Sequence, residues 1–442
     1  MKTFARGIGN LKHRKGATEA SPLVEMPAPK RIVLPMMQNL GVPAEPIVKV
    51  GDEVVEGQKV ADSSKFVSAP IHASIAGKVT KIEKLTHPTG VQSLSIVIEA
   101  GGEAPVTMRC ELPLSPESAA PDDIRKAIRE AGIVGLGGAA FPAHVKLNPP
   151  KEKKIDTVII NGCECEPYIT IDHRLMLERT ADLIFGARLV ARAVGAGRLI
   201  FGIEENKPNA IEKIRAELGS LQLGLRTEVV PLKAKYPQGG EKMLIKSILN
   251  REVPPKGGLP MDVGVVVHNV GTTIAIADAV RFGTPLIRRA VTVTGSAVRE
   301  PKNLIVRIGT LFEDILQFCG GLTDDVAKVV MGGPMTGFAV SSLDVPVVKG
   351  TSCILALNRK DAQSFEEGDC IRCGRCIRAC PMGLMPNYLG VYTKRKNWDK
   401  VKEYNVTDCF ECGCCTYVCP SRIYLVHYVK VAKKELQLRK TV

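Results

Sequence analysis

Two cysteine runs near the C-terminal end of the chain have the same spacing. Residues 370–381 read CIRCGRCIRACP and residues 409–420 read CFECGCCTYVCP, so each run is C-x2-C-x2-C-x3-C-P. The first three thiolates of such a run can reach three corners of an iron–sulfur cube, and the fourth, placed before proline, starts a helix that leads to the other cluster. The spacing predicts two [4Fe–4S] clusters, the first held by Cys370, Cys373, Cys376 and Cys419, and the second by Cys409, Cys412, Cys415 and Cys380.

Zinc and disulfides are the alternatives to iron–sulfur clusters. A structural zinc ion needs four ligands, commonly two C-x2-C pairs, and would leave half of these cysteines unused. Disulfides require an oxidising compartment. The N-terminal stretch MKTFARGIGNLKHRKG is basic but lacks the apolar core of an export signal. Both alternatives are therefore disfavoured, and Cys414, which stands between two ligands, is a surplus cysteine.

The chain is long and basic. Its 442 residues suggest three or four domains, and its net charge is +14. The charge indicates either a generally basic surface or attraction to acidic electron carriers or an anionic membrane face. Aromatic residues are too sparse among the basic ones to indicate nucleic-acid binding. The most apolar long window, which starts at Asp262, is interrupted by polar residues, so we expect no membrane span.

Residues 31–99 are short β-runs separated by turn glycines, as in EPIVKVGDEVVEGQKVAD and FVSAPIHASIAGKVTKIE. Such alternation predicts a small domain of two sheets. It resembles the barrel-sandwich hybrids of biotinyl and lipoyl carriers. Lys65 is not framed by a carrier motif, so we interpret this domain as structural.

A glycine-rich loop, GLGGAAFPAHVKL, follows a helix expected from Pro121 to Gly132. Strands then alternate with helices, which predicts a Rossmann-like, doubly wound parallel sheet with its binding crevice at the carboxyl ends of the strands. Three polar clusters fall at strand ends, namely NGCECEP (161–167), YPQGGE (236–241) and HNVGTT (268–273). Together with the glycine loop they predict a nucleotide site at one edge of the sheet.

These motifs, the segment RAVTVTGSAVREPKNLIVRIGTLFEDIL, the stretch MGGPMTG and the cysteine runs resemble the RnfC subunits of the Rnf (Rsx) ion-translocating electron-transport complexes. The chain is more distantly similar to the NADH-oxidising, flavin-carrying subunit of respiratory complex I. The resemblance implies a multidomain α/β protein. Its expected parts are a basic N-terminal segment (1–30), a barrel-sandwich-hybrid domain (31–105), an FMN/NADH-binding domain (115–282), a β-grasp domain of the SLBB type (283–355) and a helical two-cluster ferredoxin-type domain (360–442).

The same resemblance implies the residues that contact the flavin and the nicotinamide. Glu166 is expected to act in catalysis. The complete set of implied cofactor-binding residues is Gly135, Gly137, Gly138, Lys146, Asn161, Glu164, Glu166, Tyr236, Gly239, Glu241, Asn269 and Thr272. The chain departs from the complex I pattern at three positions, where Leu136 replaces an arginine, Cys163 an aspartate and Gly240 a glutamate.

The function implied by the resemblance is electron exchange between NADH or NAD⁺ and the two clusters through FMN. The expected partners are other Rnf subunits, including the iron–sulfur subunit that interacts with ferredoxin and the membrane subunits. The expected location is peripheral, on the cytoplasmic face of the inner membrane. Two alternatives are a soluble NADH-dependent cobalamin reductase and an electron-transfer scaffold without a flavin of its own.

Overall fold

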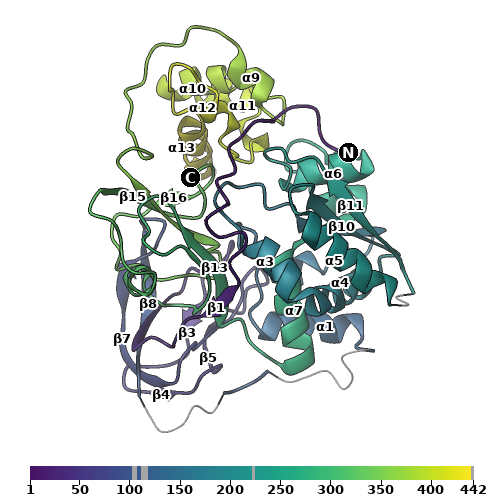
Figure 1. Cartoon of the computed structure of the whole chain (residues 1–442), viewed down its shortest axis with the longest axis vertical. Helices are drawn as coiled ribbons and strands as arrows, with labels where there is room; N and C mark the ends of the chain where they lie inside the picture. Colours follow the sequence, from purple (N-terminus) through teal and green to yellow (C-terminus); the bar gives the residue numbers. More distant parts are fainter. Residues whose placement is uncertain (102–106, 111–117, 222–223, 440–442) are drawn as a thin grey trace.

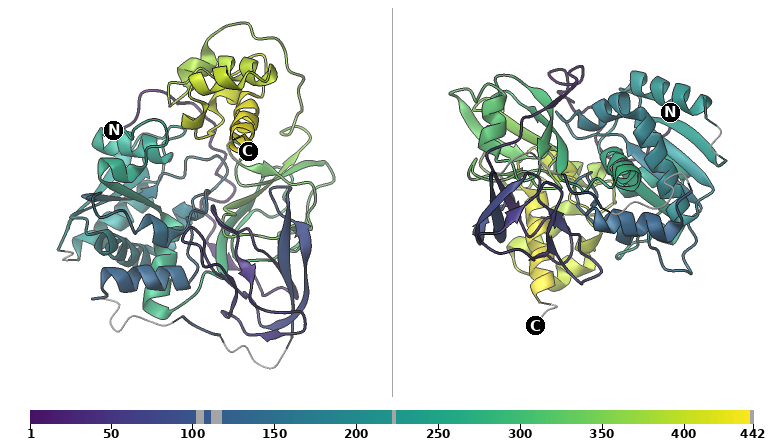
Figure 2. Two further views of the ribbon diagram at one scale, coloured as in Figure 1. Left: turned by 180° about the vertical axis from the view of Figure 1, so that it is seen from behind. Right: turned by 90° about the horizontal axis from the view of Figure 1, so that it is seen from below.

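The computed structural model describes residues 1–101, 107–110, 118–221 and 224–439. Figure 1 shows three groups of elements: β-rich domains on one side, a helix-covered sheet on the other, and a helical C-terminal domain above both. The view from behind in Figure 2 gives the same arrangement. The predicted domain boundaries at residues 105 and 115 lie outside the described residues.

The N-terminal β domain consists of two small sheets that pack face to face. Ile32, Leu34, Ile96 and Ile98 point to one face of their sheet and are fully buried in the core between the sheets. One sheet has the order β2 (Arg31–Pro35), β8 (Gln92–Ala100), β7 (Gly77–Thr86), β4 (Glu53–Val54). The other has the order β3 (Glu45–Pro46), β5 (Lys59–Asp62), β6 (Ile71–His72). The predicted two-sheet domain is confirmed.

The nucleotide domain is built on a four-stranded, fully parallel sheet. Its strands are, in spatial order, β11 (Arg226–Leu232), β10 (Arg198–Glu204), β9 (Thr157–Gly162) and β12 (Val265–Asn269). The chain winds outward in one direction from β9 to β11 and then crosses to β12 on the other side of β9. The strand order therefore reverses between β9 and β12, which is the position where such sheets bind ligands.

Helices cover both faces of this sheet. Ile160 of β9 contributes to the core on one face and its neighbour Ile159 to the core on the other. The first face is covered by the helices α1 (Pro121–Glu130), α3 (Ile171–Glu178), α4 (Thr180–Val194), α5 (Pro208–Gly219) and α7 (Val270–Phe282). The second face is covered by α6 (Glu241–Leu249) and η1 (Pro260–Val263). The short helix α2 (Ala143–Lys146) follows the glycine loop. The predicted doubly wound fold is confirmed.

The β-grasp domain has a six-stranded mixed sheet beside the helix α8 (Phe312–Phe318). Val291, Val293 and Leu304 form its core with Phe312. The strand order is β1 (Leu23–Glu25), β14 (Lys302–Arg307), β13 (Arg288–Thr294), β17 (Cys353–Asn358), β15 (Val326–Met331) and β16 (Phe338–Ala339). Strand β1 comes from the N-terminal segment and pairs in parallel with β14.

The C-terminal domain is helical, and Leu389, Val401 and Val429 lie in its core. Its elements are α9 (Arg375–Ala379), α10 (Pro386–Lys394), α11 (Trp398–Glu403), η2 (Val406–Asp408), α12 (Cys414–Tyr417) and α13 (Leu425–Leu438). Among the helices that the structure describes, none has the length and apolar character needed to span a bilayer.

The first twenty residues lie along the nucleotide domain and reach the β-grasp sheet (Figure 1). Ile8 exchanges backbone hydrogen bonds with Tyr236, at 2.8 and 2.9 Å. Lys15 is buried, and its ammonium group donates to the carbonyl oxygen of Glu164 at 2.7 Å. This lysine therefore adds nothing to the basic surface that the composition indicates.

Candidate functional site

The reversal point of the parallel sheet brings two asparagines side by side. Asn161 of β9 and Asn269 at the end of β12 are register partners. The side-chain amide of Asn161 donates to the Gly239 carbonyl at 2.8 Å. The Asn269 side-chain oxygen accepts from the Thr272 amide at 3.2 Å and so caps α7. The predicted polar clusters 161–167 and 268–273 thus meet at this edge. The third, 236–241, is bonded to the first through the Gly239 carbonyl.

A cavity of about 540 Å³ opens at this edge of the sheet. All twelve predicted cofactor-binding residues line it: Gly135, Gly137, Gly138, Lys146, Asn161, Glu164, Glu166, Tyr236, Gly239, Glu241, Asn269 and Thr272. The wall is completed by the 331–337 turn of the β-grasp domain and by Phe410 and Cys412 of the second cysteine run. Three domains therefore form one cavity.

The glycine loop is fixed by its flanks. The Leu136 amide donates to the Thr272 hydroxyl at 2.8 Å, and the Gly135 amide donates to the Phe141 carbonyl at 2.8 Å. Gly138 has a φ of +127°, and a Cβ atom built on it meets no atom within 4 Å. The loop therefore leaves open space beside Gly138 that a flat ring or a phosphate can occupy.

The carboxylate of Glu164 is already bonded within the protein. It accepts from the Asp172 amide at 2.6 Å and the His173 amide at 3.3 Å, at the first turn of α3, where the helix dipole favours negative charge. The Lys15 ammonium lies 3.7 Å away. Burial, with the nearby charge of Glu164, raises the pKa of Asp172 to about 7. Asp172 also lines the cavity and accepts from the Asn269 side chain at 2.6 Å.

Glu166 joins the nucleotide domain to the β-grasp domain. Its Oε1 accepts from the Met335 amide at 2.7 Å and the Thr336 amide at 3.1 Å. Burial raises the pKa of this carboxyl group. A Cβ atom built on Gly333 would overlap the Glu166 side chain, so only glycine allows the turn to lie this close. The residue expected in catalysis therefore holds the 331–337 turn in the cavity wall.

The second cysteine run lies directly against the cavity. The Tyr236 hydroxyl donates to the Cys412 carbonyl at 2.7 Å. A Cβ atom built on Gly240 would lie 3.3 Å from the Phe410 ring, and one built on Gly413 would lie 2.7 Å from the Met335 carbonyl oxygen. These close approaches place the loop of the second run beside the cavity.

Thiols of the two cysteine runs lie close enough to influence one another's pKa. Burial raises the pKa of Cys409 to about 12, and the neighbouring Cys412 and Cys380 add to the rise. Cys380 therefore lies with the second run, although it belongs to the first in sequence. Burial also raises the pKa of Cys376, to which Cys419 and Cys370 contribute. In the described part of the chain, no group of three or more His, Cys, Asp or Glu side chains is placed to hold a single metal ion.

Two buried residues that line the cavity are not among the predicted cofactor-binding residues, although one of them, His268, stands in the predicted cluster 268–273. Arg289 of β13 is 2% exposed, and His268 of β12 is also buried. The Nε atom of Arg289 and the Nε2 atom of His268 have no hydrogen-bond partner. The alternation of β13 could have revealed Arg289, because it shares the inward face with Val291 and Val293.

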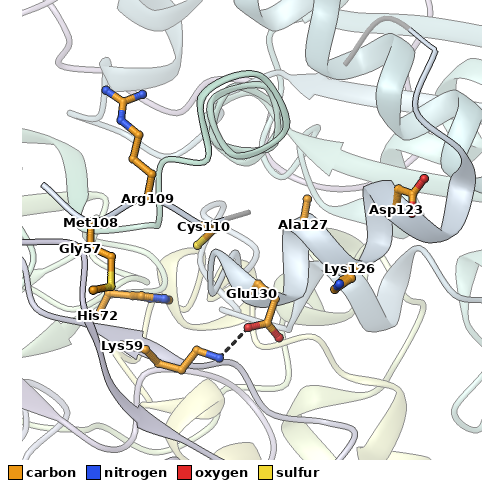
Figure 3. Close-up of a pocket in the computed structure, with 10 residues that line it drawn as sticks. All are labelled: Gly57, Lys59, His72, Met108, Arg109, Cys110, Asp123, Lys126, Ala127 and Glu130. Atoms are coloured by element: carbon orange, nitrogen blue, oxygen red, sulfur yellow. Dashed lines mark hydrogen bonds and ion pairs between the residues drawn. The ribbon is translucent and has the colours of Figure 1, made fainter. Parts of the chain in front are cut away.

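A second cavity, of about 400 Å³, lies between the N-terminal β domain and α1. Figure 3 shows Lys59 and Glu130 pointing toward one another across it, and they form an ion pair at 2.6 Å. Buried His72 also lines this cavity. None of the predicted site residues is among its lining residues.

Comparison with known proteins agrees with this architecture. Four family descriptions match successive parts of the chain: the RnfC barrel sandwich hybrid domain (2–103), the Nuo51 FMN-binding domain (128–278), the SLBB domain (290–339) and the 4Fe-4S dicluster domain (369–423). An NAD⁺-reducing [NiFe]-hydrogenase in the air-oxidized state has a similar fold, with a TM-score of 0.51 and 21% identity. That match covers 65% of this chain and 55% of the hydrogenase chain.

Two curated relatives match almost end to end. The RnfC subunit of the proton-translocating ferredoxin:NAD(+) oxidoreductase complex of Clostridium ljungdahlii is 46% identical, over 98% of this chain and 94% of its own length. The corresponding subunit of the Na(+)-translocating complex of Acetobacterium woodii is 44% identical, over 98% and 97%. Since the identity is high and extends over the whole architecture, the chain belongs to the RnfC family of the ion-translocating oxidoreductase complexes.

Proposed function

We propose that this chain exchanges electrons between NADH or NAD⁺ and two [4Fe–4S] clusters through FMN, as a subunit of an ion-translocating ferredoxin:NAD⁺ oxidoreductase complex. The observation that carries the proposal is the composite cavity. It lies at the reversal point of a parallel sheet, where nucleotides bind, and Cys412 of the second cysteine run is part of its wall.

The cavity residues suit a flavin nucleotide. Gly138 leaves open space, and Lys146 at the rim, paired with Glu241 at 2.5 Å, places a cation near the glycine loop. The chemistry that FMN supplies when bound is the conversion of a two-electron hydride into single electrons, which iron–sulfur clusters accept one at a time. The protein binds and orients the nucleotides and keeps bulk water away from them.

The two predicted clusters differ in their position relative to the cavity. The cluster of Cys380, Cys409, Cys412 and Cys415 is the proximal one, because Cys412 lines the cavity. The distal cluster is the one held by Cys370, Cys373, Cys376 and Cys419. Its ligand Cys370 is exposed, and the neighbouring Ile371 is 67% exposed. We infer that the proximal cluster exchanges electrons with the cavity and the distal cluster exchanges them with partner subunits.

The placement in the cell follows from the same proposal. The relatives are subunits of ion-translocating complexes, and the helices described here do not cross a bilayer. The chain therefore sits peripherally on the cytoplasmic face of the membrane, held there by its partner subunits. The exposed distal cluster loop, which carries the exposed residues Ile371 and Arg372, is the natural contact for the iron–sulfur partner.

Cofactor content and single cysteine variants test the proposal. The anaerobically reconstituted chain should hold FMN and about eight iron and eight sulfide, and NADH should bleach the flavin. Zinc in place of iron, or a chain that takes up no flavin, would contradict it. In Cys373→Ser, NADH should still reduce the proximal cluster. In Cys412→Ser, the distal cluster should be reducible by dithionite but not by NADH, and the reverse pattern would refute the proposed order.

A further inference from the structure

We propose that Arg289 binds the phosphate of FMN and does so from the β-grasp side of the cavity. The inference rests on the proposed function, because it assigns a part of the flavin nucleotide to a residue. Nothing in the motif comparison points to this arginine. Its burial, its bonding and the charges around it support this assignment.

Arg289 is a buried cation with unused bonding capacity. Its Nη2 donates to the Leu136 carbonyl at 2.7 Å, but its Nε has no partner. A buried guanidinium without full pairing is costly unless a ligand completes it. Because Arg289 lines the cavity, an anion bound there can accept the free N–H. Guanidinium groups bind phosphate with two parallel hydrogen bonds, which makes a phosphate the best-matched ligand.

The surroundings of the guanidinium also favour a phosphate. Its Nη1 would lie 3.6 Å from a Cβ atom built on Gly271, in the first turn of α7. This helix has thirteen residues, and the amino ends of helices attract anions. The glycine loop itself reads GLGGAA over residues 135–140 and carries no charged side chain. The buried arginine that touches Leu136 therefore supplies, from another domain, a cation beside the loop in addition to Lys146 at the rim.

Four charged groups, of which Arg289 and Lys15 are buried, set the charge of this corner. Arg289 and Lys15 are cations, whereas Asp172 and Glu164 are potential anions, and the side chain of Asn269 donates to Asp172. Glu164 is bonded to the first turn of α3, so Asp172 is the carboxyl group that competes for Arg289. The pKa of Asp172 is about 7, so below that pH its carboxyl group is protonated and no longer competes with a bound phosphate for the Arg289 guanidinium. Above that pH its carboxylate attracts the Arg289 guanidinium and repels phosphate.

The primary test compares FMN with riboflavin, which lacks the phosphate. Flavin-free full-length protein is titrated with each, and the dissociation constant is read from the flavin fluorescence. Arg289→Gln should weaken FMN binding about 10- to 100-fold and leave riboflavin binding unchanged. Arg288→Gln is the matched control, because this neighbour on β13 points outward and pairs with Glu25 at 2.6 Å. Its FMN affinity should equal that of the wild type.

The other outcomes are also decisive. Equal losses for FMN and riboflavin would overturn the phosphate assignment. If Arg289→Gln leaves the FMN affinity unchanged but raises the KM for NADH, the arginine contacts the dinucleotide and not FMN, which would overturn the proposal. A wild-type chain that binds neither flavin would refute the proposed function itself, not the role of Arg289 alone.

A second variant keeps the proposal testable if Arg289→Gln does not fold. Asp172→Asn removes the competing carboxylate but keeps an oxygen that can accept from Asn269. At pH 8 this variant should bind FMN about 3- to 10-fold more tightly than the wild type, and the advantage should disappear at pH 6. Riboflavin affinity should not change. An FMN affinity at pH 8 equal to that of the wild type would overturn the proposal.

Discussion

Replacement of Glu166 by alanine removes the acceptor that holds the 331–337 turn in the cavity wall. In the wild type, the Met335 and Thr336 amides both donate to the Glu166 carboxylate, at 2.7 and 3.1 Å. Without it both amides lose their partner, Met335 in a partly buried position and Thr336 in an exposed one. The turn also contacts the cluster loop at Gly413. We therefore expect the alanine variant to loosen the wall of the cavity without removing the groups that line the flavin end.

The size of the effect follows from the two hydrogen bonds. A hydrogen bond to a charged group contributes about 1.5–3 kcal/mol. Burial raises the pKa of Glu166, so part of the gain is offset by the cost of burying the charge, and the lower end of the range applies. The two bonds then contribute about 3 kcal/mol, which corresponds to about a 100-fold change in the local opening equilibrium. Glu166→Gln keeps a neutral acceptor and should lose about half of this free energy.

Amide hydrogen exchange measures the opening directly. Exchange at Met335 and Thr336 should accelerate about 100-fold in Glu166→Ala and about tenfold in Glu166→Gln. The KM for NADH should rise about 10- to 100-fold in the alanine variant, because the turn lines the cavity, while the flavin content stays at the wild-type level. Wild-type exchange rates in Glu166→Ala would refute the role of the carboxylate in holding the turn. A wild-type response to NADH would refute its role in NADH use.

Four further perturbations test other parts of the structure. Cys380→Ser should abolish the EPR signal of the cluster held by Cys409, Cys412 and Cys415, whereas loss of the upstream cluster alone would contradict the exchanged ligand. Gly138→Val should empty the flavin site as measured by absorbance, since its side chain enters the cavity. Gly195→Val, which has the same kind of backbone strain at the end of α4, should keep the flavin. Lys15→Met should lower the midpoint of thermal unfolding, because it leaves the buried Glu164 unpaired, while Lys12→Met at an exposed position should not. High salt should release the chain from membranes that lack its partner subunits, and retention under those conditions would indicate direct insertion into lipid.

The sequence was sufficient to predict that the predicted site residues gather at one place, because parallel strands all end at one edge of their sheet. Asn161 and Asn269 are more than one hundred residues apart, yet each follows a β-run, and the structure makes them register partners. The spacing of the cysteine runs predicts in the same way that Cys380 joins the thiols of the other run, and the Cys380 thiol influences the pKa of Cys409. In both cases a local pattern determines a long-range contact through the geometry of a repeated element.

Contacts between domains could not be predicted in this way. The alternation of apolar residues shows which face of an element is buried, but not which side chain of another domain covers it. The bond from Glu166 to the Met335 amide joins residues 169 positions apart, and neither segment has a pattern that indicates the other. Lys15 lies in a stretch whose composition resembles a solvated basic tail, and only the fold shows that it is buried beside Glu164.

The contacts that escaped prediction share one location, the junction of the domains at the cavity. Arg289 reaches the cavity from the β-grasp sheet, Lys15 reaches the 161–169 loop from the N-terminal segment, and Cys412 enters from the cluster domain. The nucleotide domain alone therefore supplies an incomplete site. Because the cluster loop is held against the cavity by Tyr236 and by the turn bound to Glu166, the separation between the flavin site and the proximal cluster depends on contacts between domains. A substitution that loosens those contacts should slow electron transfer even when every cofactor remains bound, which distinguishes the contribution of the junction from that of the cofactor ligands.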